Sequence, residues 1–183
     1  SAGTGQWSTA TNWDLDRLPL STDDVCIGPG FSVTLSTGTQ TIATLFVDSS
    51  SSLTVSGGSL SIAGASQVNG PLTLSAGTLS GTGDITVSGL LSWTGGTMTG
   101  TGRTRTSGGL TIGTSTVTLS GGRILENPTG ATTTMTANLS LATSNSATIE
   151  NAGLWDVQND ADFTDLGGTG TRTITNTGTF RKS

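Results

Sequence analysis

The most regular side chains that could bind a ligand are paired hydroxyls, with one apolar residue inside each pair. The pairs recur every 19 residues between residues 59 and 118. On a flat parallel sheet they would form two ladders, with about 4.8 Å between strands and about 7 Å along a strand. A double ladder of this kind predicts an ice-binding face, whereas the preference of Thr for exposed strand positions favours an ordinary solvated face. The candidate ice-binding residues are Ser59, Ser61, Thr78, Ser80, Thr97, Thr99, Thr116 and Thr118.

Carboxylates that could hold a metal ion gather in one acidic run. Asp156, Asp160, Asp162 and Asp165 lie within ten residues of one another. Oxygen ligands of this type suit Ca²⁺. The spacing matches neither an EF-hand loop nor a glycine-rich nonapeptide series, so a solvated acidic loop is the competing interpretation. We expect no cofactor.

Two tryptophans close to the N-terminus have two interpretations. Trp7 and Trp13 could offer a stacking platform to a glycan, or they could cap the first coil of a repeat structure together with Pro19. The ends of a stacked repeat expose apolar surface and unpaired strand edges, which favours the cap. Trp93 occupies a repeat position at which the other coils have inward-pointing apolar residues, so we expect it to be a core residue.

A catalytic set is not evident in the sequence. Cys26 is the only cysteine and the chain has no histidine, so a Cys-His pair cannot form. Asp84, Arg103 and Arg105 are spaced to meet on one face, but one carboxylate with two arginines is not an acid/base pair. We therefore expect a protein that is not an enzyme, with a polysaccharide-binding or polysaccharide-degrading β-helix as an alternative.

The elements that must position these residues are short strands marked by apolar-x-apolar triplets. Three series of such strands repeat with a step of 19 residues, and a step of 20 relates the triplets at residues 25–27 and 45–47. After residue 119 the step lengthens to 22 and places Leu139 opposite Val117. The series are Leu53, Leu72, Leu91 and Leu110; Leu60, Leu79, Met98 and Val117; and Val68, Val87, Thr106 and Leu125.

Self-similarity at this period predicts an all-β fold, a parallel β-helix (β-solenoid) with three short strands per coil and a coil period of 19–20 residues. A single coil cannot bury enough apolar surface to offset its ordering, so the coils must stack. We expect one continuous domain with an N-terminal cap in residues 1–24. Regular coils follow in residues 25–125, and less regular coils with inserted loops in residues 126–183.

Composition excludes two classes of partner. The 183-residue chain has a formal net charge of −5 and a pI of about 4.3. Binding to nucleic acid depends on clustered Lys and Arg, which this chain lacks. It also lacks a run of about 20 apolar residues, so we expect no direct membrane insertion.

Distinctive motifs stand at both ends of the repeat. Residues 7–13 read Trp-Ser-Thr-Ala-Thr-Asn-Trp and are followed by Pro19 and by Asp-Asp-Val at 23–25, while Ile-x-Asn-x-Gly-x-aromatic occurs at 149–155 and at 174–180. With these motifs and its 19-residue coils, the chain resembles the repetitive β-helical regions of bacterial surface proteins of the filamentous-haemagglutinin and autotransporter adhesin type. The resemblance implies an extracellular or cell-surface module with a structural or adhesive role as shaft, spacer or filament-forming unit. Its expected partners are further copies or coils stacked end to end, and surface glycans or proteins.

Overall fold

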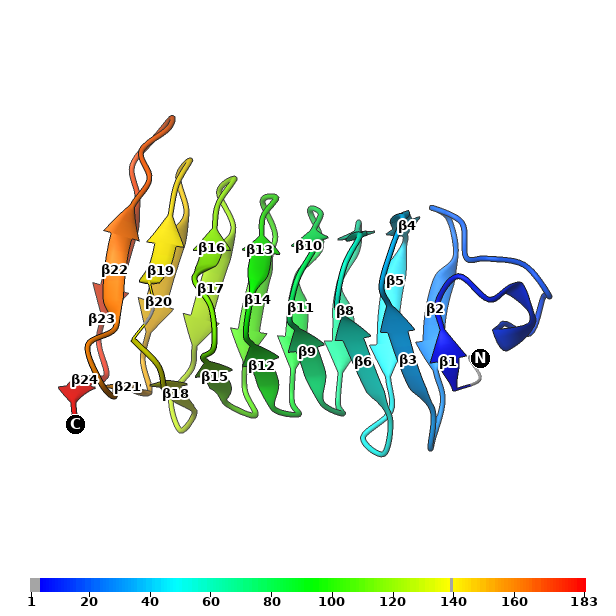
Figure 1. The fold of residues 1–183 in the computed structure, drawn as a ribbon, viewed down its shortest axis with the longest axis horizontal. Coiled ribbons are helices and arrows are strands. Elements are labelled where there is room, and N and C mark those ends of the chain that lie inside the picture. Colours follow the sequence, from blue (N-terminus) through cyan, green and yellow to red (C-terminus); the bar gives the residue numbers. More distant parts are fainter. Residues whose placement is uncertain (1–3, 139) are drawn as a thin grey trace.

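The apolar-x-apolar triplets form the strands of the protein. Because side chains alternate along a strand, both apolar residues of a triplet point to the same side. In the computed structural model, which describes residues 4–138 and 140–183, these strands wind into a parallel β-solenoid with three strands per coil (Figure 1). The predicted fold class is confirmed.

The first sheet has nine strands and contains the series that begins at Leu53. Leu53, Leu72, Leu91 and Leu110 lie side by side, so the predicted step of 19 holds here. Its strands, in spatial order, are β1 (Gly5–Gln6), β3 (Ser32–Leu35), β6 (Ser52–Val55), β9 (Leu72–Leu74), β12 (Leu91–Trp93), β15 (Leu110–Ile112), β18 (Thr132–Met135), β21 (Leu154–Val157) and β24 (Thr179–Lys182).

The second sheet has seven strands and carries the paired hydroxyls. Leu60, Leu79 and Met98 lie in register on its inner side, as predicted. Its strands, in chain order, are β4 (Thr39–Ile42), β7 (Ser59–Ile62), β10 (Thr78–Ser80), β13 (Gly96–Met98), β16 (Val117–Leu119), β19 (Ser140–Thr143) and β22 (Asp162–Asp165).

The third sheet has eight strands and closes each coil. Val68 and Val87 are in register, and Val87 in turn lies beside Thr106. Its strands, in spatial order, are β2 (Asp24–Ile27), β5 (Thr44–Val47), β8 (Ser66–Val68), β11 (Ile85–Val87), β14 (Arg103–Thr106), β17 (Ile124–Asn127), β20 (Thr148–Asn151) and β23 (Thr173–Asn176).

The later coils are longer than the pattern predicted. The average period is about 21 residues rather than 19–20. Val117 pairs with Leu141, a step of 24, whereas the pattern placed Leu139 opposite it; Leu139 lies outside the described residues. The extra residues enter at corners, where a longer loop costs little conformational entropy. Ile149 does pair with Ile174, and Trp155 with Phe180, as the shared motif predicted.

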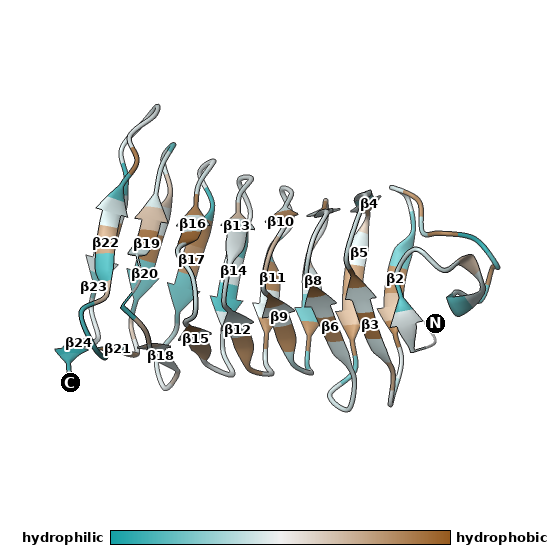
Figure 2. Ribbon diagram, viewed as in Figure 1, coloured by the Kyte–Doolittle hydropathy of each residue, from teal (hydrophilic) through white to brown (hydrophobic). Residues whose placement is uncertain are grey.

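The interior changes from apolar to partly polar along the stack. Figure 2 shows apolar strands in the middle coils and hydrophilic ones at the C-terminal end. Arg123 and Asn127 are fully buried, and Asn151 is nearly so. The Nδ2 group of Asn127 donates to Oδ1 of Asn151 at 2.6 Å, and Asn151 donates in the same way to Asn176 at 2.6 Å. This asparagine ladder gives the buried side-chain N–H groups of Asn127 and Asn151 acceptors in the next coil, while Oδ1 of Asn127 has no partner among the described residues.

The segment before β2 lies across the N-terminal end of the stack (Figure 1). Strand β1 adds to the first sheet beside β3, and a 3-10 turn follows over Ala10–Asn12. Trp7 is fully buried and Trp13 is 6% exposed. Their rings meet edge to face, with centroids 4.9 Å apart. Both indoles belong to the hydrophobic core.

Among the described residues, no helix has the length and apolar character needed to cross a membrane.

Candidate surface sites

The hydroxyl pairs of the second sheet align, but not all with the predicted partners. Thr78 lies between Ser59 and Thr97, as expected. Thr97 then pairs with Thr118, which is 21 residues later, and not with Thr116. Trp93 and Ile112 still pair at a step of 19, so the two extra residues enter in the turn between Ile112 and Val117 and shift the following strand by two residues. Thr116 therefore leaves the predicted array.

The corrected array has five rungs of two hydroxyl residues. Ser120 takes the place beside Thr99, and its Oγ atom donates to Thr99 Oγ1 at 3.0 Å. Strand β4 adds a rung at the N-terminal end, because Thr39 and Thr41 pair with Ser59 and Ser61. The array ends at Ala142, which lies beside Thr118. The five rungs are Thr39 and Thr41, Ser59 and Ser61, Thr78 and Ser80, Thr97 and Thr99, and Thr118 and Ser120.

A second line of hydroxyls runs along the outer side of the first sheet, and the sequence reasoning missed its regularity. In this sheet, each strand from β3 to β18 carries Ser or Thr at the position between its two inward residues. The signal was present in the sequence, since these residues are the middle letters of the apolar triplets. In spatial order they are Thr34, Thr54, Thr73, Ser92, Thr111 and Thr134.

The tryptophans do not form an open platform. A sugar stacks on an exposed aromatic face, and the rings of Trp7 and Trp13 are both inside the structure. The Nε1 group of Trp13 donates to the main-chain oxygen of Trp7 at 2.9 Å, which fixes the two rings together. The alternative interpretation as a glycan platform is therefore corrected, because both tryptophans are core residues. Trp93 is fully buried, as its phase predicted.

The four candidate calcium ligands do not form a cluster, and three of them have cationic partners. Asp156 is buried, and Arg181 donates two hydrogen bonds to its carboxylate, at 3.0 and 2.8 Å. These bonds hold the pKa of Asp156 far below its usual range. Arg172 contacts Asp165 at 2.6 Å and also lowers the pKa of that carboxyl group.

The other two candidate ligands, Asp160 and Asp162, lie near the C-terminal end of the stack. Asp160 lies 3.9 Å from the amino group of Lys182, and Asp162 is an exposed residue of β22. Within the described part of the chain, no group of three or more acidic, histidine or cysteine side chains could hold a metal ion. The described structure does not bring the candidate calcium ligands together, because the run spans a buried strand, a turn and the edge strand of another sheet.

The charged residues of the third sheet form ion pairs across coils. The guanidinium of Arg103 contacts Glu126 at 2.9 Å and Glu150 at 2.5 Å, while Arg105 also pairs with Glu126. These contacts raise the pKa of Arg103. The predicted cluster is corrected in one respect: the carboxylate of Asp84 accepts the main-chain N–H of Arg103, not its guanidinium. The two glutamates, which the sequence reasoning missed, are ion-paired with arginines.

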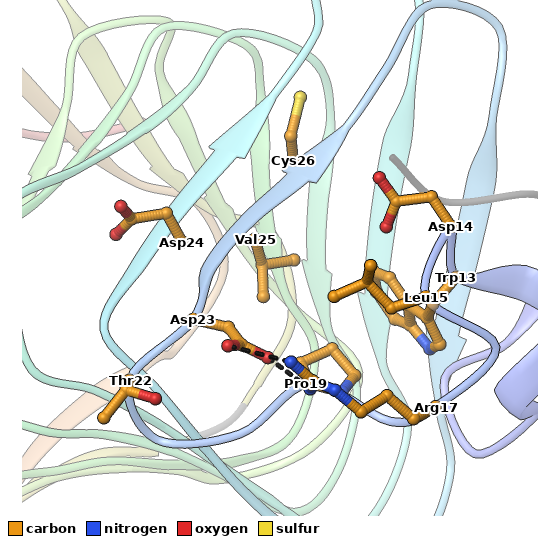
Figure 3. A pocket seen from close by; sticks show the side chains of 10 residues that line it. All are labelled: Trp13, Asp14, Leu15, Arg17, Pro19, Thr22, Asp23, Asp24, Val25 and Cys26. Carbon is orange, nitrogen blue, oxygen red and sulfur yellow. Dashed lines mark hydrogen bonds and ion pairs between the residues drawn. The ribbon is translucent and has the colours of Figure 1, made fainter.

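A hollow of about 430 Å³ lies between the N-terminal segment and strand β2. Trp13, Leu15 and Val25 give it apolar walls, and three aspartates line it as well. Figure 3 shows the guanidinium of Arg17 against the carboxylate of Asp23, at 2.6 Å. This ion pair raises the pKa of Arg17 and lowers that of Asp23. Cys26 is exposed at the rim.

Comparisons with protein-family models, with curated proteins and with solved structures gave no match to the chain.

Proposed function

We propose that the chain is a rod-like module of a secreted or cell-surface protein, in which it serves as a shaft or spacer. The observation that supports this role is the continuity of the three sheets. Each sheet runs through the stack without a break in strand pairing. About eight coils at about 4.8 Å per coil give a rod on the order of 40 Å long.

Three parallel sheets suit a spacer because each coil is held to the next by hydrogen bonds on all of its sides. Bending or stretching the rod must distort several of these strand pairs together. Charged residues make up only 10% of the chain, and hydroxyl side chains occupy the outer sides of two sheets. Such a surface stays hydrated and offers few strong contacts to neighbouring molecules.

The location can be tested with antibodies raised against the folded chain. We expect them to label intact cells of the natural source, or the protein in its culture medium, without permeabilisation. Labelling that appears only after lysis would contradict a surface or secreted role.

The three roles of spacer, adhesin and polysaccharide enzyme differ in what the chain retains or releases. The immobilised chain is exposed to glycan arrays, to host-surface proteins and to a panel of soluble polysaccharides. A spacer retains nothing and releases no product. Saturable retention that is lost when the hollow beside Trp13 is altered by Asp24→Arg would indicate an adhesin, and shortened polysaccharide chains would indicate an enzyme.

Ice binding is the second candidate function, and the corrected double ladder of the second sheet favours it. Five consecutive rungs carry a hydroxyl at both outward positions, from β4 to β16. Regularly spaced hydroxyl and methyl groups on a rigid parallel sheet could match the repeat of an ice surface. The first sheet carries a comparable line, so the two faces must be separated by experiment.

Thermal hysteresis and ice-crystal shaping test this candidate. Thr97→Lys places a charge in the middle of the second-sheet array, Thr73→Lys does so on the first sheet, and Thr86→Lys is the matched control on the third. If the second sheet binds ice, only Thr97→Lys abolishes the activity. No hysteresis in the wild-type chain, or equal loss in all three variants, would contradict the assignment.

A further inference from the structure

The outer side of the first sheet carries a second line of residues beside its line of hydroxyls. These residues stand just before the first inward residue of each strand, so they also point outward. We call them the flanking line. Two of its members differ from the rest, because Leu90 has a large apolar side chain and Gly109 has none. From β3 to β18 the flanking line consists of Ser32, Ser52, Pro71, Leu90, Gly109 and Thr132.

A hollow of about 390 Å³ lies where the flanking line lacks a side chain. Gly109 lines it and has a φ of +96°, a conformation that favours glycine. Leu90 and Thr132 border the hollow along the flanking line, and Thr111 and Thr134 border it on the side of the hydroxyl line. Leu90 is 46% exposed. An exposed leucine thus lies beside a hollow that can accept a second aliphatic side chain.

This face is uncharged within residues 32–135, all of which the structure describes. The outward residues of the first sheet are there Ser, Thr, Pro, Leu and Gly. The third sheet differs, because Arg103, Arg105 and Glu126 form ion pairs on its outer side. The five rungs of the second sheet are uncharged too, but they carry hydroxyls and no large apolar side chain. Because the chain has a net charge of −5, two copies repel each other least when uncharged faces meet.

The adjacent positions of Leu90 and Gly109 make this face complementary to itself. Leu91 pairs with Leu110, so Leu90 and Gly109 lie one strand spacing apart, which is about 4.8 Å. A two-fold axis that runs parallel to the strands, midway between β12 and β15, exchanges these two positions. Each leucine then meets the partner's Gly109. A two-fold axis along the stack would instead oppose each strand to its own copy and leave both hollows without a leucine.

We propose that the outer face of the first sheet binds a second copy of the chain, with the two stacks antiparallel and each Leu90 placed against the partner's Gly109. Such an interface is isologous and closes as a dimer. The same axis opposes Ser92 to the partner's Thr111. The inference stands apart from the shaft role, because it rests only on the first sheet. Either one can fail without the other.

The size of the face predicts a weak dimer. The axis opposes the strands from β3 to β24 of one copy to those of the other. Eight strands at about 4.8 Å, each with about four residues at about 3.3 Å, cover roughly 500 Å² per copy. The total of about 1,000 Å² is at the lower limit for a specific interface. We therefore expect reversible association that depends strongly on the leucine at its centre.

Sedimentation velocity over a concentration series tests the dimer. The wild-type chain is expected to dimerise reversibly, with little dependence on salt, because uncharged residues meet at the centre of the interface. Leu90→Ser removes both central leucines from the dimer and should weaken it roughly tenfold or more. Phe46→Ser is the matched control, because Phe46 is 40% exposed and lies on the third sheet. This variant should dimerise like the wild type.

An introduced ion pair tests the geometry. Thr111→Lys and Ser92→Glu should each weaken their own homodimer, whereas a mixture of the two chains should form a heterodimer tighter than either homodimer. Thr86→Lys on the third sheet should leave the dimer unchanged, and circular dichroism checks that each variant is folded.

Three results would overturn the proposal: a wild-type chain that stays monomeric, a Leu90→Ser dimer as tight as wild type, or a mixture no tighter than its components. A neutral sugar that binds a monomeric wild-type chain but not the Leu90→Ser chain would also overturn it, and would assign the hollow to a glycan.

Discussion

Arg123 is a buried cation held by neutral oxygens. Its guanidinium donates to Thr104 Oγ1 at 2.9 and 3.1 Å and to the carbonyl oxygens of Gly81 and Arg103. Burial lowers the pKa of Arg123 to about 10, and the side chain is therefore still charged at neutral pH. It fills a corner of the coil where the preceding coil has Gly102, at which an added Cβ would lie 3.0 Å from Nη1 of Arg123.

We predict that the volume of Arg123 matters more to stability than its charge. Arg123→Ala leaves a cavity and should lower the free energy of unfolding by about 2–4 kcal/mol. Arg123→Met keeps most of the volume and removes a desolvated charge, so its change should stay within about 1 kcal/mol. Urea unfolding at pH 7 measures both. An equal loss in the two variants would show instead that the hydrogen bonds of the guanidinium are essential.

Asp156 makes the stability of the last two coils depend on pH. Its pKa in the folded chain lies below the value of about 3.9 in an unfolded one, because Arg181 stabilises the ionised form. The stabilisation is therefore complete above about pH 4 and is lost as the pH falls through the folded pKa. Arg181→Gln should lower the melting temperature at pH 7, and its difference from wild type should shrink toward pH 2. A difference that is independent of pH would contradict this assignment.

At the scale of elements, the asparagine ladder connects the third sheet to the first across three coils. Asn151 accepts from Asn127 and donates both to Asn176 and to the carbonyl oxygen of Thr179, at 2.6 and 3.1 Å. Asn176 is exposed and, among the described residues, donates to Gly178 O at 3.3 Å. The two asparagines share a motif but differ in burial.

We predict a graded response along this ladder. Asn151→Ala leaves buried polar groups without partners and should cost about 2–4 kcal/mol in the free energy of unfolding. Asn176→Ala should cost less than about 1 kcal/mol, because water can replace the lost contacts at the open end. Chemical denaturation compares the two. Similar losses of unfolding free energy in the two variants would contradict the prediction that burial within the ladder determines the cost.

At the scale of the whole molecule, the coils differ in how many neighbours protect them. Strands β6, β9, β12 and β15 alternate buried and half-buried residues, whereas all residues of β23 and β24 are exposed. In a stacked repeat, stability depends on the interfaces with adjacent coils. The end coil therefore opens most easily.

Hydrogen exchange measured by mass spectrometry should show this gradient. We expect amides in residues 173–182 to exchange first and amides in residues 53–112 to exchange last. Uniform protection along the chain would indicate that the solenoid unfolds as one cooperative unit.

The sequence alone was sufficient for the fold class and for the inner side of most strands. Leu53, Leu72, Leu91 and Leu110 could be aligned because apolar residues alternate with polar ones and recur at one interval. The alternation can be recognised within a single strand, because neighbouring residues of a strand point to opposite faces. The same reasoning placed Trp93 and the Ile-x-Asn-x-Gly-x-aromatic motifs correctly.

Only the tertiary structure decided which outward residues are neighbours. Thr97 pairs with Thr118 rather than Thr116, because the corners of that coil absorb two extra residues and the apolar interior then sets the register. The acidic run separated for a similar reason: Asp156 entered a buried strand that reached Arg181, 25 residues later. The repeat pattern determines whether a side chain points inward or outward. The lengths of the turns between strands determine which residues of adjacent coils pair. Those pairings become visible only in the stacked structure.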